Sequence, residues 1–221
     1  MKVFAFSDTH FTNKFNQREF NFLKDKIDSV DLVIINGDFW EGLMGKFDDF
    51  LNSDWKKLFP ILKQKAIYIY GNHDDPHLSD ERVNQFCKDA VKDYTLKTNK
   101  RTYFFTHGQN YLYPREEIES PDWTRANDKK QIYTNKIADV IQNVLISVLG
   151  PHAYPKKFNN MTLDERKSIT SLDNLLVCGH SHTPQYNKDI NFIDLGFFNY
   201  GWANYMLIDD EGNFELKSEK Y

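Results

Sequence analysis

The stretch Gly179-His180-Ser181-His182-Thr183-Pro184 carries two histidines one residue apart. It follows a short apolar run at residues 175–178, which predicts a buried strand. Because His180 and His182 lie just past a strand end, both imidazoles can project toward one point above a sheet. Imidazole binds zinc, iron, manganese and nickel well. Taken alone, the pair is also compatible with two loop histidines that bind nothing.

Four more β-prone runs end in residues with metal-binding side chains. These ends are Asp8-Thr9-His10, Gly37-Asp38, Gly71-Asn72-His73-Asp74 and His107-Gly108. Alternate residues of a strand share a face, so we expect Asp8 and His10 to point the same way. Open parallel sheets bind ligands beyond the carboxyl ends of their strands. All five strand ends are therefore expected to converge on one site.

The rest of the chain alternates between strand and helix patterns, which predicts an α/β fold with a largely parallel sheet covered by helices. The expected strands are residues 3–6, 32–35, 66–70, 94–97, 102–106, 175–178, 185–187, 192–195, 203–209 and 214–217. The expected helices are residues 15–27, 49–62 with its end near Pro60, and 81–90 with Ser79 as its cap.

Residues 111–172 interrupt this alternation. Apolar residues at steps of three and four predict a long amphipathic helix over 132–149, stopped by Gly150-Pro151. A shorter helix is expected at 163–172, with Thr162 and Glu165 as a capping box. We interpret this segment as a helical cap inserted into a single domain that spans residues 1–221.

The composition and net charge limit the classes of function that the chain can have. The 221 residues carry a formal net charge of −4, and their lysine pairs are scattered. A nuclease of long nucleic acids would favour a basic surface, so nucleic acid is a less favoured partner. Two cysteines predict no disulfide framework, and no apolar stretch is long enough to span a membrane. We expect a soluble cytoplasmic protein, with peripheral contact to a membrane surface left open.

The convergent groups are too many for one tetrahedral ion and suit two ions that share a carboxylate. Asp38 is the natural bridge because a carboxylate has two oxygens. Mixed nitrogen and oxygen ligands favour manganese, with iron, zinc or nickel as alternatives. Two such ions activate water for phosphoryl transfer, and their residual positive charge favours an anionic substrate. The expected ligands are Asp8, His10, Asp38, Asn72, His107, His180 and His182.

His73 remains beside the expected ligand Asn72. It can donate a proton or a hydrogen bond to the phosphate or the leaving group. The alternative is a structural histidine held by Asp74 or Asp38.

In this order, the motifs Asp-x-His, Gly-Asp, Gly-Asn-His-Asp, His-Gly and Gly-His-x-His resemble the calcineurin-like metallophosphoesterase superfamily. Residues 192–196 resemble its closing strand. The resemblance implies a four-layer α/β-β/α sandwich. It assigns Asp8, His10 and His182 to one metal, and gives His73 the transition-state role. It assigns Asn72, His107 and His180 to the other metal. In this assignment, Asp38 bridges the two metals.

Within that superfamily, residues 37–41, the helical insertion and the length look most like UDP-2,3-diacylglucosamine pyrophosphohydrolase of lipid A synthesis. Three departures put the substrate in doubt. His73 stands where arginine is common, Gln109 follows His-Gly where aspartate is usual, and Gly196 is not followed by the usual Gly-Asp-Trp pattern. A nucleotide- or lipid-linked pyrophosphate is expected. A phosphodiesterase or nuclease and a non-catalytic scaffold that keeps the fold are the alternatives.

The cap is expected to select the substrate. One interpretation makes its apolar stripe a groove for acyl chains; the other packs that stripe against the second insert helix and the body. Nearby aromatic residues could instead stack on a nucleotide base. The stripe comprises Ile137, Val140, Ile141, Val144, Leu145 and Val148, and the aromatic residues are Tyr111, Tyr113, Trp123, Tyr133 and Tyr154.

Overall fold

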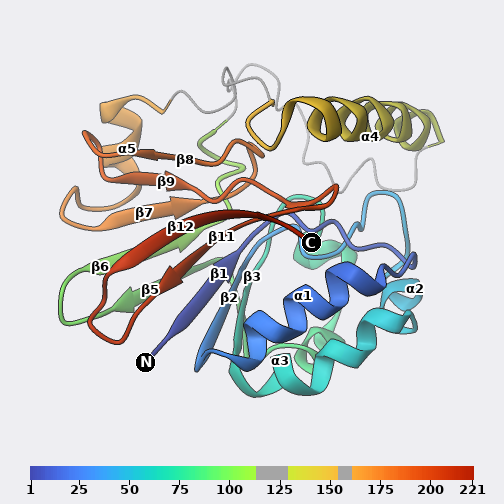
Figure 1. Cartoon of the computed structure of the whole chain (residues 1–221), viewed down its shortest axis with the longest axis horizontal. Coiled ribbons are helices and arrows are strands. Elements are labelled where there is room, and N and C mark those ends of the chain that lie inside the picture. Colours follow the sequence, from blue (N-terminus) through green and yellow to red (C-terminus); the bar gives the residue numbers. More distant parts are fainter. Residues whose placement is uncertain (113–128, 154–160) are drawn as a thin grey trace.

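Two β-sheets lie face to face in the computed structural model, with helices on their outer sides (Figure 1). The structure describes residues 1–112, 129–153 and 161–221. Within the helix Lys129–Leu149, it describes the side chains of Ile132, Tyr133, Ile137 and residues 140–149. The predicted α/β architecture of two sheets flanked by helices is confirmed.

The first sheet has the order β10-β11-β1-β2-β3-β4, with β12 paired to β11. Its strands β1 to β4 are parallel, and β11 joins β1 antiparallel. Val3 and Ala5 pack toward the second sheet, whereas Phe4 and Phe6 pack toward the helices. Both faces are therefore buried, which explains the unbroken apolar runs. The strands are β1 (Val3–Phe6), β2 (Leu32–Asn36), β3 (Ala66–Ile69), β4 (Asp89–Val91), β10 (Phe198–Asn199), β11 (Trp202–Ile208) and β12 (Phe214–Lys220).

The second sheet has the order β5-β6-β7-β9-β8. Its central strands β6, β7 and β9 are parallel, and β5 and β8 are antiparallel edges. Leu175 and Val177 face the first sheet, whereas Leu176 and Cys178 face outward under a separate apolar cluster. The strands are β5 (Asp93–Lys97), β6 (Thr102–Thr106), β7 (Leu175–Cys178), β8 (Gln185–Asn187) and β9 (Phe192–Asp194).

Helices cover the outer face of the first sheet. Helix α1 (Gln17–Asp28) begins at Asn16, whose side chain accepts hydrogen bonds from the backbone of Arg18 and Glu19. Helix α1 buries Leu23 and Ile27 against the sheet. On the second sheet, helix α5 (Leu163–Ile169) packs Ile169 against the outer cluster and has the predicted capping box.

The expected single helix at 49–62 is wrong. The chain instead forms α2 (Phe47–Leu51), a 3₁₀ turn at Asp54–Leu58 and α3 (Phe59–Lys65). Pro60 lies in the first turn of α3 rather than at the end of a helix. Proline is tolerated there because first-turn amides have no intrahelical acceptor to bond.

The expected helix at 81–90 is also wrong. A 3₁₀ turn occupies Glu81–Gln85, and Asp80 rather than Ser79 caps it. Residues 89–91 then form β4, where Tyr70 donates its backbone N–H to the carbonyl of Val91. The free edge of β3 offered hydrogen bonds that a helix would have left unused. Tertiary pairing therefore overrode the helical spacing.

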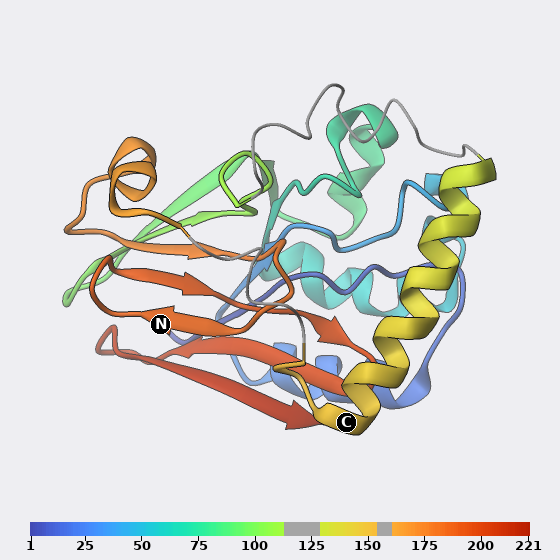
Figure 2. The same cartoon turned by 90° about the horizontal axis from the view of Figure 1, so that it is seen from above.

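The insertion contains α4 (Lys129–Leu149) and α5, and these two helices lie at opposite ends of the molecule (Figures 1 and 2). The interpretation that packs the first insert helix on the second is therefore wrong: of these two helices, only α4 lies near the carboxyl ends of the strands. Helix α4 ends at Gly150, which adopts a φ of 85°, a left-handed conformation that favours glycine.

Candidate metal centre

Five of the seven expected ligands adopt left-handed backbone conformations immediately after strands. Among the described residues, only seven non-glycine residues have a positive φ. Such conformations cost of order 1–3 kcal/mol each, and they cluster at functional sites. Asp8 and His10 therefore converge through a turn rather than through strand alternation. The five ligands are Asp8, His10, Asp38, His180 and His182, with φ between 48° and 70°.

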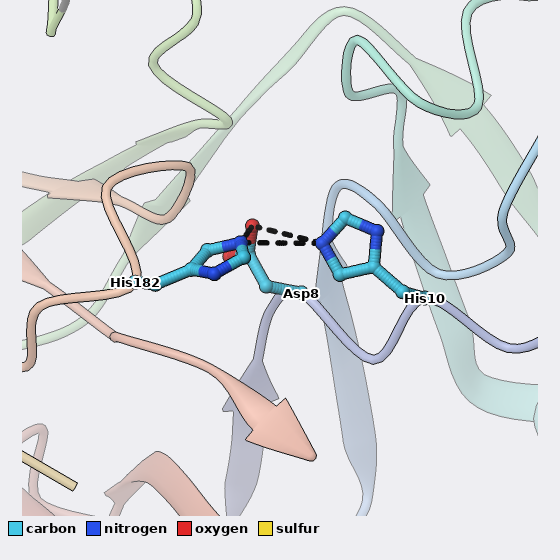
Figure 3. Close-up of side chains that lie close together, drawn as sticks. All are labelled: Asp8, His10 and His182. Atoms are coloured by element: carbon cyan, nitrogen blue, oxygen red, sulfur yellow. Dashed lines mark hydrogen bonds and ion pairs between the residues drawn. The ribbon is translucent and has the colours of Figure 1, made fainter. Parts of the chain in front are cut away.

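The first ligand group brings together Asp8, His10 and His182 (Figure 3). The two Nε2 atoms of His10 and His182 are 3.2 Å apart. His182 Nε2 also lies 3.2 Å from Asp8 Oδ1, which is 3.9 Å from His10 Nε2. Three ligand atoms thus face one another from two distant parts of the sequence.

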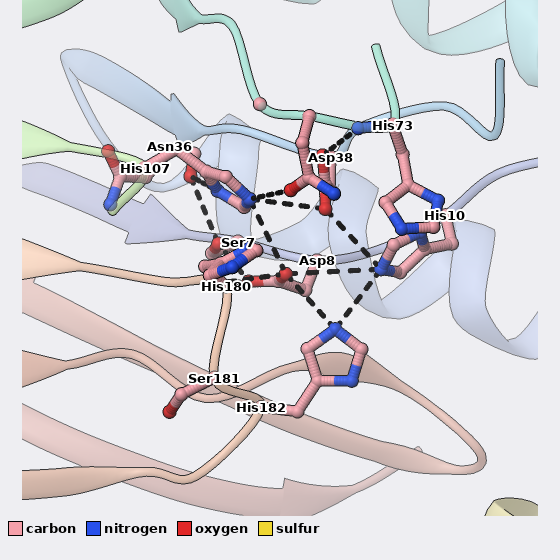
Figure 4. Close-up of polar contacts among 12 residues, drawn as sticks. Ser7, Asp8, His10, Asn36, Asp38, His73, His107, His180, Ser181 and His182 are labelled. Atoms are coloured by element: carbon pink, nitrogen blue, oxygen red, sulfur yellow. Dashed lines mark hydrogen bonds and ion pairs between the residues drawn. The ribbon is translucent and has the colours of Figure 1, made fainter. Parts of the chain in front are cut away.

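The second ligand group lies beside the first and is joined to it by Asp38 (Figure 4). His107 Nε2 lies 3.1 Å from Asp38 Oδ2 and 3.2 Å from Asn72 Oδ1. The same Asp38 oxygen is 3.8 Å from His10 Nε2. His180 completes a set with Asp38 and His107 whose ligand atoms lie within 4.8 Å of one another.

These separations fit transition-metal ions. With metal–nitrogen bonds of about 2.0–2.1 Å, neighbouring ligand atoms around one ion lie roughly 3.0–3.4 Å apart. The contacts at 3.1–3.2 Å match that spacing. The donor set mixes imidazole with carboxylate and amide oxygen, which suits manganese, iron, zinc or nickel. Asp38 faces both groups with Oδ2 alone, because its other oxygen, Oδ1, accepts the backbone N–H of His73 at 2.8 Å.

A buried carboxylate, Glu41, orients two of the histidines. Its Oε2 lies 3.1 Å from Nδ1 of His10 and 2.8 Å from Nδ1 of His73. With Nδ1 of each ring bonded to Glu41, Nε2 is the nitrogen that can meet a metal or a substrate. Burial disfavours the charged form of Glu41, but His73 and His10 outweigh it and lower the pKa of this carboxyl to about 2.

Backbone groups orient His107. Its Nδ1 lies 2.8 Å from the carbonyl of Asn36, which points its Nε2 at Asp38. The side chain of Asn36 donates to the carbonyls of Thr106 and Val177, and so ties the two sheets together at the site. Gly37 has a φ of 89°, and a Cβ there would collide with the His107 ring.

Asp74 joins the loops that follow β2 and β3. Its carboxylate accepts the backbone N–H groups of Gly71 and Phe39, each at 2.6 Å. Burial and the neighbouring charge of Asp38 raise the pKa of Asp74 to about 6. Its carboxylate oxygens thus serve the backbone, whereas the His73 ring is held by Glu41.

The buried carboxylates of the cluster favour a bound cation. Burial disfavours ionisation of Asp8 and Asp38, but the positive charge of His107 outweighs the effect of burial and lowers the pKa of both carboxyls. Burial likewise disfavours a charged His107, yet Asp38 and Asp8 raise the pKa of this imidazole to about 10. Burial and His107 together lower the pKa of His180 to about 3. A proton on His107 thus balances the carboxylates until cations replace it.

All eight residues predicted for the site lie in this cluster, whereas the roles of Glu41, Asn36 and Asp74 were missed. Glu41 belongs to residues 37–41, which supported the family resemblance. The only local indication of a role for Glu41 is its charge beside the buried Phe39 and Trp40. Nothing local marked Asn36, because its partners come from the other sheet. His73 lies within 4.8 Å of ligand atoms of His10 and Asp38, so the geometry allows it a ligand role as well.

The family model of calcineurin-like phosphoesterases matches residues 1–184. The chain belongs to this family. The family is metal-dependent, which agrees with the candidate ligand groups. A search of the curated proteins found no match.

Three solved structures illustrate the general likeness of fold. An archaeal phosphodiesterase is 16% identical, with a TM-score of 0.48 over 99% of this chain and 100% of its own. YfcE, a phosphoesterase from E. coli, is 16% identical, with a TM-score of 0.45 over 95% and 89%. Vps29 from Entamoeba histolytica, complexed with zinc, is 12% identical, with a TM-score of 0.47 over 100% and 98%. Likeness at these levels concerns the fold alone.

The insertion reaches this candidate metal centre through α4. The side-chain amide of Gln142 lies 3.0 Å from Nδ1 of His182. Tyr113, Trp123 and Tyr154, named as candidates for base stacking, lie outside the described residues. Within residues 1–112, 129–153 and 161–221, no helix is both long and apolar enough to cross a membrane.

Proposed function

We propose that the chain is a dinuclear metal-dependent hydrolase that cleaves a pyrophosphate or phosphodiester bond. The observation that carries this proposal is the single oxygen of Asp38 that faces both ligand groups. One group comprises Asp8, His10 and His182, and Asp38 bridges it to the other. The other group comprises Asn72, His107 and His180. We propose manganese as the metal, with iron, zinc or nickel as alternatives.

Two divalent ions held there would acidify a water molecule and stabilise the charge that develops on the phosphoryl oxygens. The chain's own residues supply the orientation. Glu41 fixes the ring of His10, and the carbonyl of Asn36 fixes the ring of His107. The carboxylates of Asp8 and Asp38 are held in their charged form before any cation arrives.

His73 is proposed as the group that stabilises the transition state. When both ring nitrogens are protonated, Nδ1 donates to Glu41 and Nε2 can give a proton or a hydrogen bond to the leaving oxygen. The ring is partly exposed, at 24%, whereas His107 is fully buried. Access to solvent suits a group that meets the substrate.

For the substrate, we propose a nucleotide- or lipid-linked pyrophosphate such as UDP-2,3-diacylglucosamine. Support comes from α4, which touches the site through Gln142 and carries a concentration of exposed apolar side chains. Leu145 and Leu149 lie within about 60° of Gln142 around the helix, at 100° per residue. An acyl tail that extends past His182 would meet these two residues first.

Two alternatives have weaker support. A nuclease or other phosphodiesterase would use the same centre, but the net charge of −4 disfavours binding to long nucleic acids. A non-catalytic scaffold would have no need of eight convergent polar side chains, five of them on residues with a strained backbone. Residence in the cytoplasm, peripheral membrane contact and the oligomeric state stay outside this proposal.

The test is an activity panel with the manganese-reconstituted chain, preceded by elemental analysis. The panel comprises p-nitrophenyl phosphate, bis-p-nitrophenyl phosphate, a UDP-sugar, UDP-2,3-diacylglucosamine and a short oligonucleotide. We expect two ions per chain, with the highest kcat/KM for the lipid-linked pyrophosphate. Preference for the oligonucleotide would favour the nuclease. Two bound ions with no turnover of any substrate would favour the scaffold, and fewer than two ions would refute the dinuclear centre.

A further inference from the structure

Helix α4 turns the polar side chain of Gln142 toward the metal centre, whereas Val140 and Val144 lie on its opposite face. Among its described side chains, only Ile146 is buried, and Ile146 lies one turn beyond Gln142 on the same face. Val140 and Val144 lie about 160° from Gln142 around the helix, at 100° per residue. They are 62% and 59% exposed. The contact of Gln142 with His182 is therefore a specific feature of the inward face.

The two ring nitrogens of His182 have different neighbours. The side-chain amide of Gln142 lies 3.0 Å from Nδ1, and Asp8 Oδ1 lies 3.2 Å from Nε2. Ligation through Nε2 requires that nitrogen to be unprotonated, so the proton of a neutral ring then sits on Nδ1 and needs an acceptor. The amide of Gln142 has that acceptor in its oxygen, which a half-turn of the amide can direct at Nδ1.

We propose that Gln142 is a positioning residue that couples α4 to metal loading, by accepting the Nδ1–H of His182 when Nε2 of that ring binds a metal. The inference rests on the proposed dinuclear centre. A metal-ligating histidine ordinarily gives its second N–H to an acceptor, and removal of such acceptors weakens metal binding about 10- to 100-fold. Here the acceptor comes from the insertion rather than from the body.

The coupling is reciprocal. If the docked helix favours the metal, then the metal favours the docked helix by the same factor. Among the described side chains of α4, Gln142 and the buried Ile146 both face inward, so the contact at Gln142 contributes to the docking of the helix. Metal loading should therefore order the part of the insertion that overhangs the site.

The experiment measures Mn²⁺ binding by calorimetry and amide exchange of α4 by mass spectrometry, on the full chain. Gln142→Leu removes donor and acceptor, whereas Gln142→Glu keeps the acceptor alone. Asn143→Leu and Asn143→Glu are the matched controls, because Asn143 is exposed on the next position of the helix. The second control corrects for the added charge near the cations. Thermal melting of each metal-free variant checks that the fold is intact.

We expect Gln142→Leu to weaken one Mn²⁺ site about tenfold or more and Gln142→Glu to bind at least as tightly as Asn143→Glu. Mn²⁺ should slow amide exchange in α4 of the wild type and leave exchange in Gln142→Leu unchanged. Equal affinities for Gln142→Leu and Asn143→Leu would overturn the coupling while the dinuclear centre stands. So would a Gln142→Glu variant as weak as Gln142→Leu. A wild-type chain that binds no Mn²⁺ would overturn both.

Discussion

The ligand cluster and helix α4 meet at the contact between His182 and Gln142, yet they are built in opposite ways. In the cluster, the side chains of Asp8, Asp38 and His107 are at most 2% exposed, and neighbouring polar groups hold each of them. On α4, the described large apolar side chains other than Ile132 and Ile146 are 44–76% exposed. Ligand positions that two packed sheets determine resist change. The position of a helix whose described side chains are mostly exposed can vary. The chemistry and the choice of substrate are therefore expected to respond separately to mutation.

The largest effect is expected from Asp38→Ala, which removes the oxygen that both ligand groups share. We expect turnover to be abolished and both ions to bind weakly, while α4 keeps its helical structure. Elemental analysis and the bis-p-nitrophenyl phosphate assay measure the two outcomes. Asp49→Ala is the control because Asp49 is an exposed carboxylate on α2. More than a few per cent of activity with both ions bound would disprove the bridge.

His73→Gln separates chemistry from metal binding within the centre itself. We expect turnover to fall about 10²- to 10⁴-fold, the usual contribution of one general acid or base. Metal content should not change, because the proposed ligand sets do not include His73. Metal analysis beside steady-state kinetics measures both. Loss of an ion from this variant would make His73 a ligand, which its distance to His10 and Asp38 also allows.

Acidity should affect the centre and leave the cap unchanged. Asp38 and Asp8 raise the pKa of His107 to about 10 in the metal-free chain, so a proton must leave when His107 binds a metal. His180, with a pKa of about 3, has no proton to lose near neutral pH. Burial and His73 oppose a charged His10, but Glu41 and Asp38 outweigh them and raise its pKa, so His10 releases a further proton wherever it is charged. The apparent Mn²⁺ affinity should therefore rise at least about tenfold per pH unit between roughly pH 6 and 8. Calorimetry in buffers of different ionisation enthalpy counts the released proton, and binding without proton release would contradict this assignment.

The smallest effect on the fold is expected from Val144→Asp combined with Leu145→Asp, because both side chains are largely exposed. The free energy of unfolding should change by within about 0.5 kcal/mol, and hydrolysis of bis-p-nitrophenyl phosphate should be unaffected. For UDP-2,3-diacylglucosamine, kcat/KM should fall steeply, since each buried CH₂ contributes about 0.8 kcal/mol. Chemical denaturation and the two assays give these values.

Ile146→Asp is the matched variant for that experiment, because Ile146 is the buried neighbour on the inward face. It should loosen α4 from the body and lower the rate on both substrates. Equal losses on both substrates from the Val144 and Leu145 double variant would show that the cap only supports the fold. The lipid-linked substrate would then lose its main support.

The cap also shows where the sequence interpretation went wrong. The apolar spacing at 132–149 correctly predicted a helix, since periodicity is a local property. The same spacing suggested that the apolar face packs on the body or on α5, and that is wrong: these side chains are exposed, and the two helices lie far apart. The periodicity of a segment defines a face but does not say what that face meets.

The sequence alone indicated most of the strands, though not β4 and β10, together with a set of candidate ligands at strand ends and a family. These features are encoded locally, in apolar runs followed by Asp-x-His, Gly-Asp, Gly-Asn-His-Asp and Gly-His-x-His. Only the tertiary structure decided which groups hold those ligands, because the partners are far apart in the chain. Asn36 bonds two strands of the other sheet, Glu41 joins His10 to His73, and Gln142 meets His182 from the insertion. Hydrogen bonds between such distant residues exist only once packing has brought them together, so local patterns cannot reveal them.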